Sequence, residues 1–127
     1  MPKILVCDDS RYIRVLLKKV LEDAGYQVCW AAETGEEAVD KYRELRPDAV
    51  ILDVVLPQMD GISAARAIQQ IDAGARIIMI SAYGTRAKVL RAIQSGVRDF
   101  IVKPFQNERL VEAVNHLFQE GYGETKP

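Results

Sequence analysis

The chain has 127 residues, of which 49% are apolar and 28% charged, with a formal net charge of −1. This length suits one domain, and the near-neutral charge argues against direct nucleic-acid binding by the whole surface. The apolar runs are too short to span a bilayer and no signal-peptide region is visible, so we expect a cytoplasmic protein without membrane contact. Cys7 and Cys29 are expected to be reduced core residues.

The predicted elements alternate between short apolar strands and amphipathic helices. A strand over residues 4–7 comes first, and the helix after it carries an apolar stripe that ends near Gly25. A second strand, residues 27–31, leads to a helix that begins at a capping-box sequence, residues 34–37, and stops before Pro47. The core positions expected in these two helices are Ile13, Leu16, Leu17, Val20, Leu21, Ala38, Tyr42 and Leu45.

Three more strands are predicted at residues 49–52, 76–80 and 99–102, each followed by a helical pattern. Residues 1–120 are expected to form one domain and residues 121–127 a flexible tail. The order βαβαβαβαβα predicts an α/β fold, a parallel sheet with helices on both faces. Core positions expected in the last three helices are Ala64, Ala65, Ile68, Ile71, Val89, Leu90, Ile93, Leu110, Val111, Val114, Leu117 and Phe118.

Polar side chains follow four of the predicted strands. Asp8 and Asp9 come after the first strand, Asp53 after the third, Ser81 after the fourth and Lys103 after the fifth. In a parallel sheet these ends meet at one edge, where ligands bind. Three adjacent carboxylates repel one another unless a cation is present, and a set of oxygen ligands favours a hard ion such as Mg²⁺.

The same residues suit phosphoryl chemistry. An ammonium and a hydroxyl can bind phosphoryl oxygens, and a carboxylate can attack as a nucleophile to form an aspartyl phosphate. Each acid alone could instead be a turn residue or a helix cap. Because the polar residues coincide at several strand ends, we favour one joint site.

The segments that carry these residues resemble the receiver domains of two-component response regulators, over about residues 3–119. The matching motifs are residues 7–10, 52–61, 80–82 and 102–105. The similarity is strongest to single-domain chemotaxis receivers of the CheY type, through the segments 8–14 and 103–106. It implies a flavodoxin-like (βα)5 doubly wound sheet with strand order 2-1-3-4-5.

The resemblance also implies a phosphoacceptor and a metal site. Asp53 would accept the phosphoryl group. Mg²⁺, with Mn²⁺ as a substitute, would be held by Asp8, Asp9, Asp53 and the backbone carbonyl of Val55. Val55 and Tyr83 flank the path expected for an attacking water, and their side chains predict slow loss of the phosphoryl group.

Four further positions have implied roles. Lys103 and Ser81 would contact the phosphoryl group, and Ser81 and Phe100 would form the switch. The Lys103–Pro104 bond resembles the cis peptide of the family.

The function implied is a phosphorylation-dependent signalling switch, not an enzyme beyond its own phosphorylation and dephosphorylation. A CheA-like histidine kinase would donate the phosphoryl group. The face of the fourth helix, fifth strand and fifth helix would bind an output protein, such as a flagellar switch component in chemotaxis. We expect a monomer, or a weak dimer after phosphorylation. Basic residues expected on this face are Arg86, Lys88, Arg91 and Arg98.

Three alternatives stay open at this point. The chain could be a receiver excised from a larger DNA-binding regulator, although Met1 lies just before the first strand and favours a single-domain protein. It could be a phosphorelay intermediate that docks through Arg11, Tyr12 and Arg14. An aspartyl-nucleophile phosphatase is disfavoured, because Val55 stands where those enzymes usually carry an acid.

Overall fold

The computed structural model describes residues 1–82 and 86–119. Over these ranges strands and helices alternate in the predicted order. They are β1 (Lys3–Cys7), α1 (Arg11–Asp23), β2 (Gln27–Ala32), α2 (Gly35–Leu45), β3 (Ala49–Asp53), α3 (Gly61–Ile71), β4 (Ile77–Ser81), α4 (Arg86–Gln94), β5 (Asp99–Val102) and α5 (Asn107–Leu117). Two predictions from the sequence, the tail of residues 121–127 and the role of Tyr83, lie outside the described residues.

The strands form one parallel sheet in the order β2-β1-β3-β4-β5. This confirms the α/β doubly wound fold and the strand order 2-1-3-4-5. The register aligns the carboxyl ends of neighbouring strands, with Asp53 opposite Ile80 and Ser81 opposite Val102. Side chains that leave these ends therefore share one edge of the sheet.

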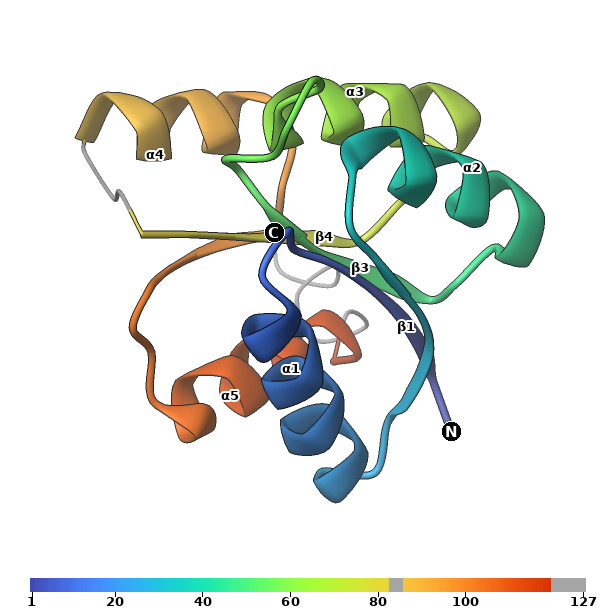
Figure 1. The fold of residues 1–127 in the computed structure, drawn as a ribbon, viewed down its shortest axis with the longest axis vertical. Helices are drawn as coiled ribbons and strands as arrows, with labels where there is room; N and C mark the ends of the chain where they lie inside the picture. Colours follow the sequence, from blue (N-terminus) through green and yellow to red (C-terminus); the bar gives the residue numbers. More distant parts are fainter. Residues whose placement is uncertain (83–85, 120–127) are drawn as a thin grey trace.

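Helices cover both faces of the sheet, with α1 and α5 on one side and α2, α3 and α4 on the other (Figure 1). Successive residues of a central strand point to opposite sides, so Ile51 packs against α1 and α5 and Leu52 packs against α2 and α3. Every residue of β3 and β4 is buried. This two-sided burial explains why the strands are nearly continuous apolar runs.

Side-chain caps begin three of the helices. Ser10 Oγ accepts the Ile13 N–H at 3.3 Å and starts α1, immediately after the acidic pair. Thr34 Oγ1 accepts the Glu37 N–H at 3.1 Å, which is half of the predicted capping box. The other half is different, because Glu37 accepts the backbone N–H of Glu33 at 3.0 Å instead of that of Thr34.

Some core assignments within the helices are wrong. Leu45, in the last turn of α2, is exposed, whereas Val39 in the first half of the same helix is buried. Leu90 and Ile93 of α4 are 49% and 55% exposed, and Ala92 is the buried residue of that helix. The helix α4 therefore contacts the core through the small side chain of Ala92 and leaves larger apolar side chains on the surface. Over the two described ranges, no helix is long and apolar enough to cross a membrane.

Candidate functional site

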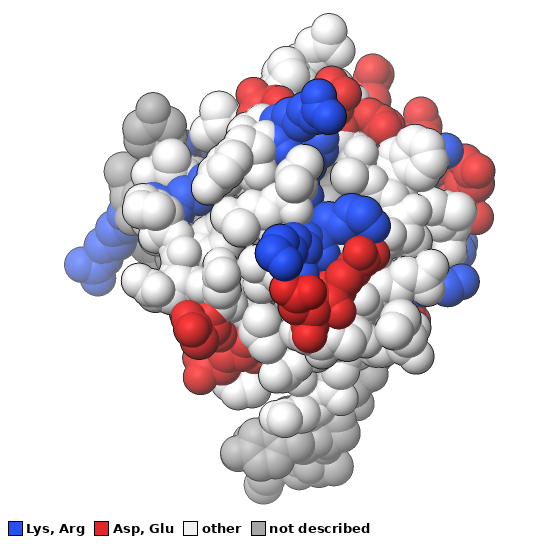
Figure 2. All heavy atoms as spheres, turned by 60° about the horizontal axis from the view of Figure 1, so that its bottom comes forward, with Lys and Arg blue, Asp and Glu red and all other residues white. Residues whose placement is uncertain are grey.

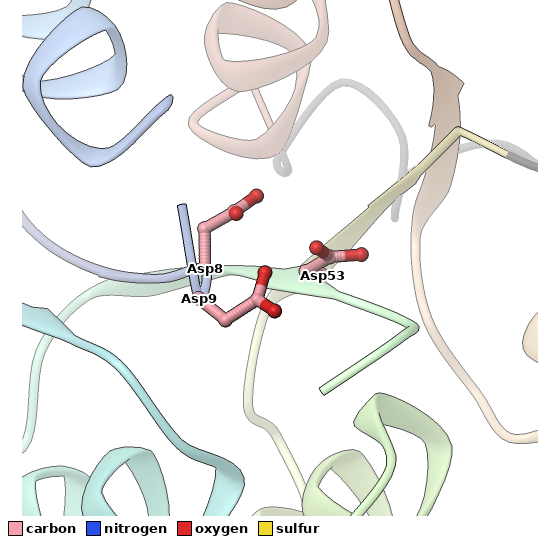
Figure 3. Close-up of side chains that lie close together, drawn as sticks. All are labelled: Asp8, Asp9 and Asp53. Carbon is pink, nitrogen blue, oxygen red and sulfur yellow. The ribbon is translucent and has the colours of Figure 1, made fainter. Parts of the chain in front are cut away.

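Three carboxylates meet at the carboxyl end of the sheet. Asp8 directly follows β1, Asp53 is the last residue of β3, and Asp9 leaves the end of β1 toward Asp53 (Figure 3). One carboxylate oxygen from each residue lies within 4.8 Å of the others. Asp8 and Asp53 are buried, whereas Asp9 is exposed. The predicted acidic group is therefore a real cluster, open to solvent on the Asp9 side.

Lys103 joins the two buried carboxylates. Its ammonium donates to Asp8 Oδ2 at 2.7 Å and to Asp53 Oδ2 at 3.0 Å. The Lys103 N–H donates to the Ser81 carbonyl at 2.8 Å, which extends the pairing of β4 and β5 by one residue. The peptide bond between Lys103 and Pro104 is cis. The lysine side chain is thus placed by the sheet itself.

Backbone amides hold the remaining oxygens of the two buried acids. The Ser10 N–H donates to Asp8 Oδ1 at 2.9 Å, and the Val55 N–H donates to Asp53 Oδ1 at 3.1 Å. Each carboxylate therefore has one oxygen on a backbone amide and the other on the Lys103 ammonium. This arrangement fixes the orientation of both groups.

Without a further cation, burial and mutual repulsion disfavour the ionised carboxylates of the site. Burial raises the pKa of Asp53, the charge of Asp8 raises it further, and Lys103 acts in the opposite direction. Burial disfavours the Lys103 ammonium, but its hydrogen bonds with Asp8 and Asp53 outweigh this and raise its pKa. Three carboxylates and one ammonium leave two negative charges when all are ionised. This all-oxygen donor set fits one divalent hard cation such as Mg²⁺.

Comparison with known proteins identifies the family. The sequence model for the response regulator receiver domain matches residues 4–115. The chain belongs to the response regulator receiver domain family.

Relatives of this receiver include chemotaxis proteins. It is 50% identical over 113 residues to the chemotaxis protein CheY of Bacillus subtilis, covering 89% of this chain and 94% of the relative. It is 49% identical over 115 residues to CheY of Thermotoga maritima, covering 91% and 96%. A crystal structure of the CheX–CheY–BeF3–Mg²⁺ complex from Borrelia burgdorferi matches with a TM-score of 0.88, 36% identity and coverage of 91% and 88%.

The residues expected to form the switch lie on neighbouring strands of the receiver. Ser81 is the last residue of β4, and its side chain is fully buried. Phe100 in β5 is half-buried and packs against the core cluster on the side of α3 and α4. Val55 lies two residues after Asp53 and is exposed, and its predicted place beside the path of an attacking water stays a prediction.

Two residues near the site were given no such role from the sequence. A Cβ placed on Gly61 would lie 2.1 Å from the carbonyl oxygen of Asp53, so only glycine allows this close approach of α3. Arg14 was grouped with Arg11 and Tyr12 as a docking residue. In the structure its Nη1 donates to the Asp8 carbonyl at 2.8 Å, while Arg11 and Tyr12 are exposed; the docking role stays a prediction. Arg14 lies six residues after Asp8 in the first turns of α1, and this spacing was the sequence feature that could have indicated a contact with the Asp8 backbone.

A groove of the receiver lies apart from the acidic cluster. It has a volume of about 620 Å³, lies between α1 and α5, and is lined by none of the site residues.

On the face shown in Figure 2, acidic and basic side chains are intermixed. Two ion pairs of α1 join Lys18 to Glu22 at 2.9 Å and Lys19 to Asp23 at 3.2 Å.

Proposed function

We propose that this receiver is a phosphorylation-dependent signalling switch in which Asp53 accepts a phosphoryl group from the phosphohistidine of a CheA-like histidine kinase. The observation that carries the proposal is the Lys103 ammonium shared between Asp8 and Asp53, with Asp9 within 4.8 Å of both. Asp53 is oriented beside the Lys103 ammonium and two further carboxylates. Phosphoryl transfer depends on such positioning and on stabilisation of the charge on the phosphoryl group.

The proposed reaction forms one bond and breaks one. An oxygen of Asp53 attacks phosphorus, the new O–P bond forms as the N–P bond of the donor breaks, and imidazole leaves. The Val55 amide and the Lys103 ammonium keep the attacking carboxylate oriented. Later attack by water would release phosphate and restore the carboxylate. In this proposal the protein promotes only its own phosphorylation and dephosphorylation.

A divalent cation completes the proposed site. Asp8, Asp9, Asp53 and the Val55 carbonyl would hold Mg²⁺, and Mn²⁺ would substitute because it takes the same oxygen ligands. When bound, the ion neutralises negative charge on the phosphoryl oxygens. The chain's own contribution is the buried, pre-oriented carboxylates and the Lys103 ammonium that balances part of their charge.

The proposed output begins with Ser81. Its hydroxyl would move toward a phosphoryl oxygen, and Phe100 would turn into the vacated space. Both residues adjoin the surface formed by α4, β5 and α5, where Leu90, Ile93 and Val102 are exposed. A change at this surface would alter affinity for a partner. The chemotaxis proteins among the relatives support a flagellar switch component as that partner.

Beryllofluoride, which mimics a phosphoryl group, tests this function. It would be added with Mg²⁺ to the wild type and to Asp53→Asn, and amide chemical shifts would be followed by NMR. We expect shifts in the wild type that centre on Asp53 and extend to Ser81 and Phe100. Asp60→Asn is the matched control, since Asp60 is exposed and only caps α3, and it should respond as the wild type does. An unresponsive wild type, or an equal response in Asp53→Asn, would refute the proposal.

A further inference from the structure

Arg14 holds the backbone that carries the acidic pair. Its Nη1 donates to the carbonyl oxygen of Asp8 at 2.8 Å, and its side chain is only 14% exposed. We propose that Arg14 is a positioning residue that sets how tightly the acidic site binds a divalent cation. This inference rests on the proposed function, because it concerns the same site.

The acid that most needs positioning is Asp9. Among the described residues, none makes a hydrogen bond or an ion pair with the Asp9 carboxylate, so its location depends on its backbone. The Asp8 carbonyl belongs to the peptide plane that joins Asp8 to Asp9. A hydrogen bond from Arg14 to this carbonyl therefore resists rotation of the plane and movement of the Asp9 side chain.

The other anchors of this segment leave that plane partly free. The Asp8 N–H donates to the Ala32 carbonyl at 3.1 Å, and the Ser10 N–H donates to Asp8 Oδ1 at 2.9 Å. These bonds fix the residue on each side of Asp9. Arg14 supplies the contact to the carbonyl between Asp8 and Asp9, through a rigid planar group that suits this task.

The second contact of Arg14 is weaker. Its Nη2 lies 3.6 Å from Glu33 Oε1, and the Glu33 side chain is 67% exposed. Solvent screens such a pair, so it contributes little to the position of the guanidinium. Glu33→Gln would therefore remove the ion pair and leave the bond to the Asp8 carbonyl in place.

Charge and positioning predict opposite effects on metal affinity. Removing the positive charge of Arg14 would reduce repulsion of Mg²⁺ and, by itself, tighten binding. Losing the bond to the Asp8 carbonyl would loosen the acidic pair and weaken binding. The sign of the change thus separates the two roles.

The experiment is a calorimetric titration of Mg²⁺ into the wild type and variants, with folding checked by circular dichroism. We expect Arg14→Gln to weaken Mg²⁺ binding by about tenfold, the lower end for groups that orient metal ligands. Arg14→Lys, which keeps the positive charge and one donor nitrogen, should recover part of the loss. Arg11→Gln removes an exposed charge of the same helix turn, and it and Glu33→Gln should stay within about twofold of the wild type.

The outcomes distinguish this inference from the proposed function. Equal or tighter binding by Arg14→Gln would overturn the positioning role, while the metal site itself would stand. Absence of Mg²⁺ binding by the wild type would overturn the proposed function. If Arg14→Gln fails to fold, Arg14→Lys is compared with Arg11→Lys; weaker binding by the first alone supports the role, and equal affinities overturn it.

Discussion

Replacing Asp53 by Asn tests whether the ionised Asp53 carboxylate destabilises the folded protein when no metal is bound. Asp53 is buried beside Asp8, and burial together with that neighbouring charge raises its pKa. A raised pKa for an acid means that the folded protein disfavours the ionised form. The neutral amide should therefore make the metal-free protein more stable, although it removes the proposed phosphoacceptor.

The magnitude follows from three opposing terms. The carboxylate oxygens of Asp53 and Asp8 lie within 4.8 Å of each other, so the repulsion between these groups is at least about 3.5 kcal/mol for an effective dielectric constant of about 20. Attraction to the Lys103 ammonium at 3.0 Å is about 5.5 kcal/mol on the same scale. Attraction to Lys103 exceeds repulsion by Asp8 by at most about 2 kcal/mol. Burial of the charged Asp53 carboxylate costs several kcal/mol, which is more than this difference. We expect a net gain of roughly 1–3 kcal/mol, and Lys103 keeps Asp8 as its partner.

The assay is urea unfolding followed by circular dichroism at neutral pH with a chelator. Asp60→Asn is the control: its oxygen accepts the Ser63 N–H at 2.8 Å, and Asn caps helices as well as Asp, so little change is expected. Because the folded-state pKa of Asp53 is raised, the advantage of Asp53→Asn should be larger at neutral pH than in acid. It should fade as the pH falls toward the ordinary value of 3.8. If the variant is no more stable than the wild type at neutral pH, ionised Asp53 does not destabilise the metal-free protein.

Four further substitutions test other parts of the site. Lys103→Gln removes the shared ammonium and should lower the free energy of unfolding by about 3 kcal/mol in the same urea assay without metal, since two buried carboxylates lose their counter-charge; an unchanged midpoint would contradict this. Gly61→Ala forces a Cβ to 2.1 Å from the Asp53 carbonyl oxygen, and we expect a loss above about 2 kcal/mol by urea unfolding. Normal stability there would mean that the loop relaxes freely. Val55→Asn and Tyr83→Glu should each shorten the phosphoryl lifetime, followed by loss of radiolabel. A rapid wild-type decay that neither change accelerates would count against their proposed role.

The strand ends were the most predictable part of the receiver. Residues such as Ile51 and Leu52 pack on opposite faces of the sheet, so a central strand must be apolar throughout, and the first polar residue marks its end. Asp53 and Ser81 are the last residues of their strands for this reason. The family and the strand order, inferred from motifs at these ends, are confirmed.

Side-chain directions on the helices were less predictable. Leu90 and Ile93 have helical spacing, yet α4 buries only Ala92 and presents both larger residues to solvent. Periodicity shows that a helix has an apolar face, but it does not show whether the core or a partner covers that face. Arg14 was missed for a related reason, because its role depends on how far a long side chain reaches back to the Asp8 carbonyl.

The central claim is that Asp53 is the residue that accepts a phosphoryl group. The most direct measurement is intact-protein mass spectrometry after incubation with a small phosphoryl donor such as phosphoramidate, with Mg²⁺ or with a chelator. We expect addition of one phosphoryl group to the wild type and to Asp60→Asn with Mg²⁺, with none on Asp53→Asn and little with the chelator. Equal phosphorylation of Asp53→Asn, or none of the wild type with Mg²⁺, would contradict it.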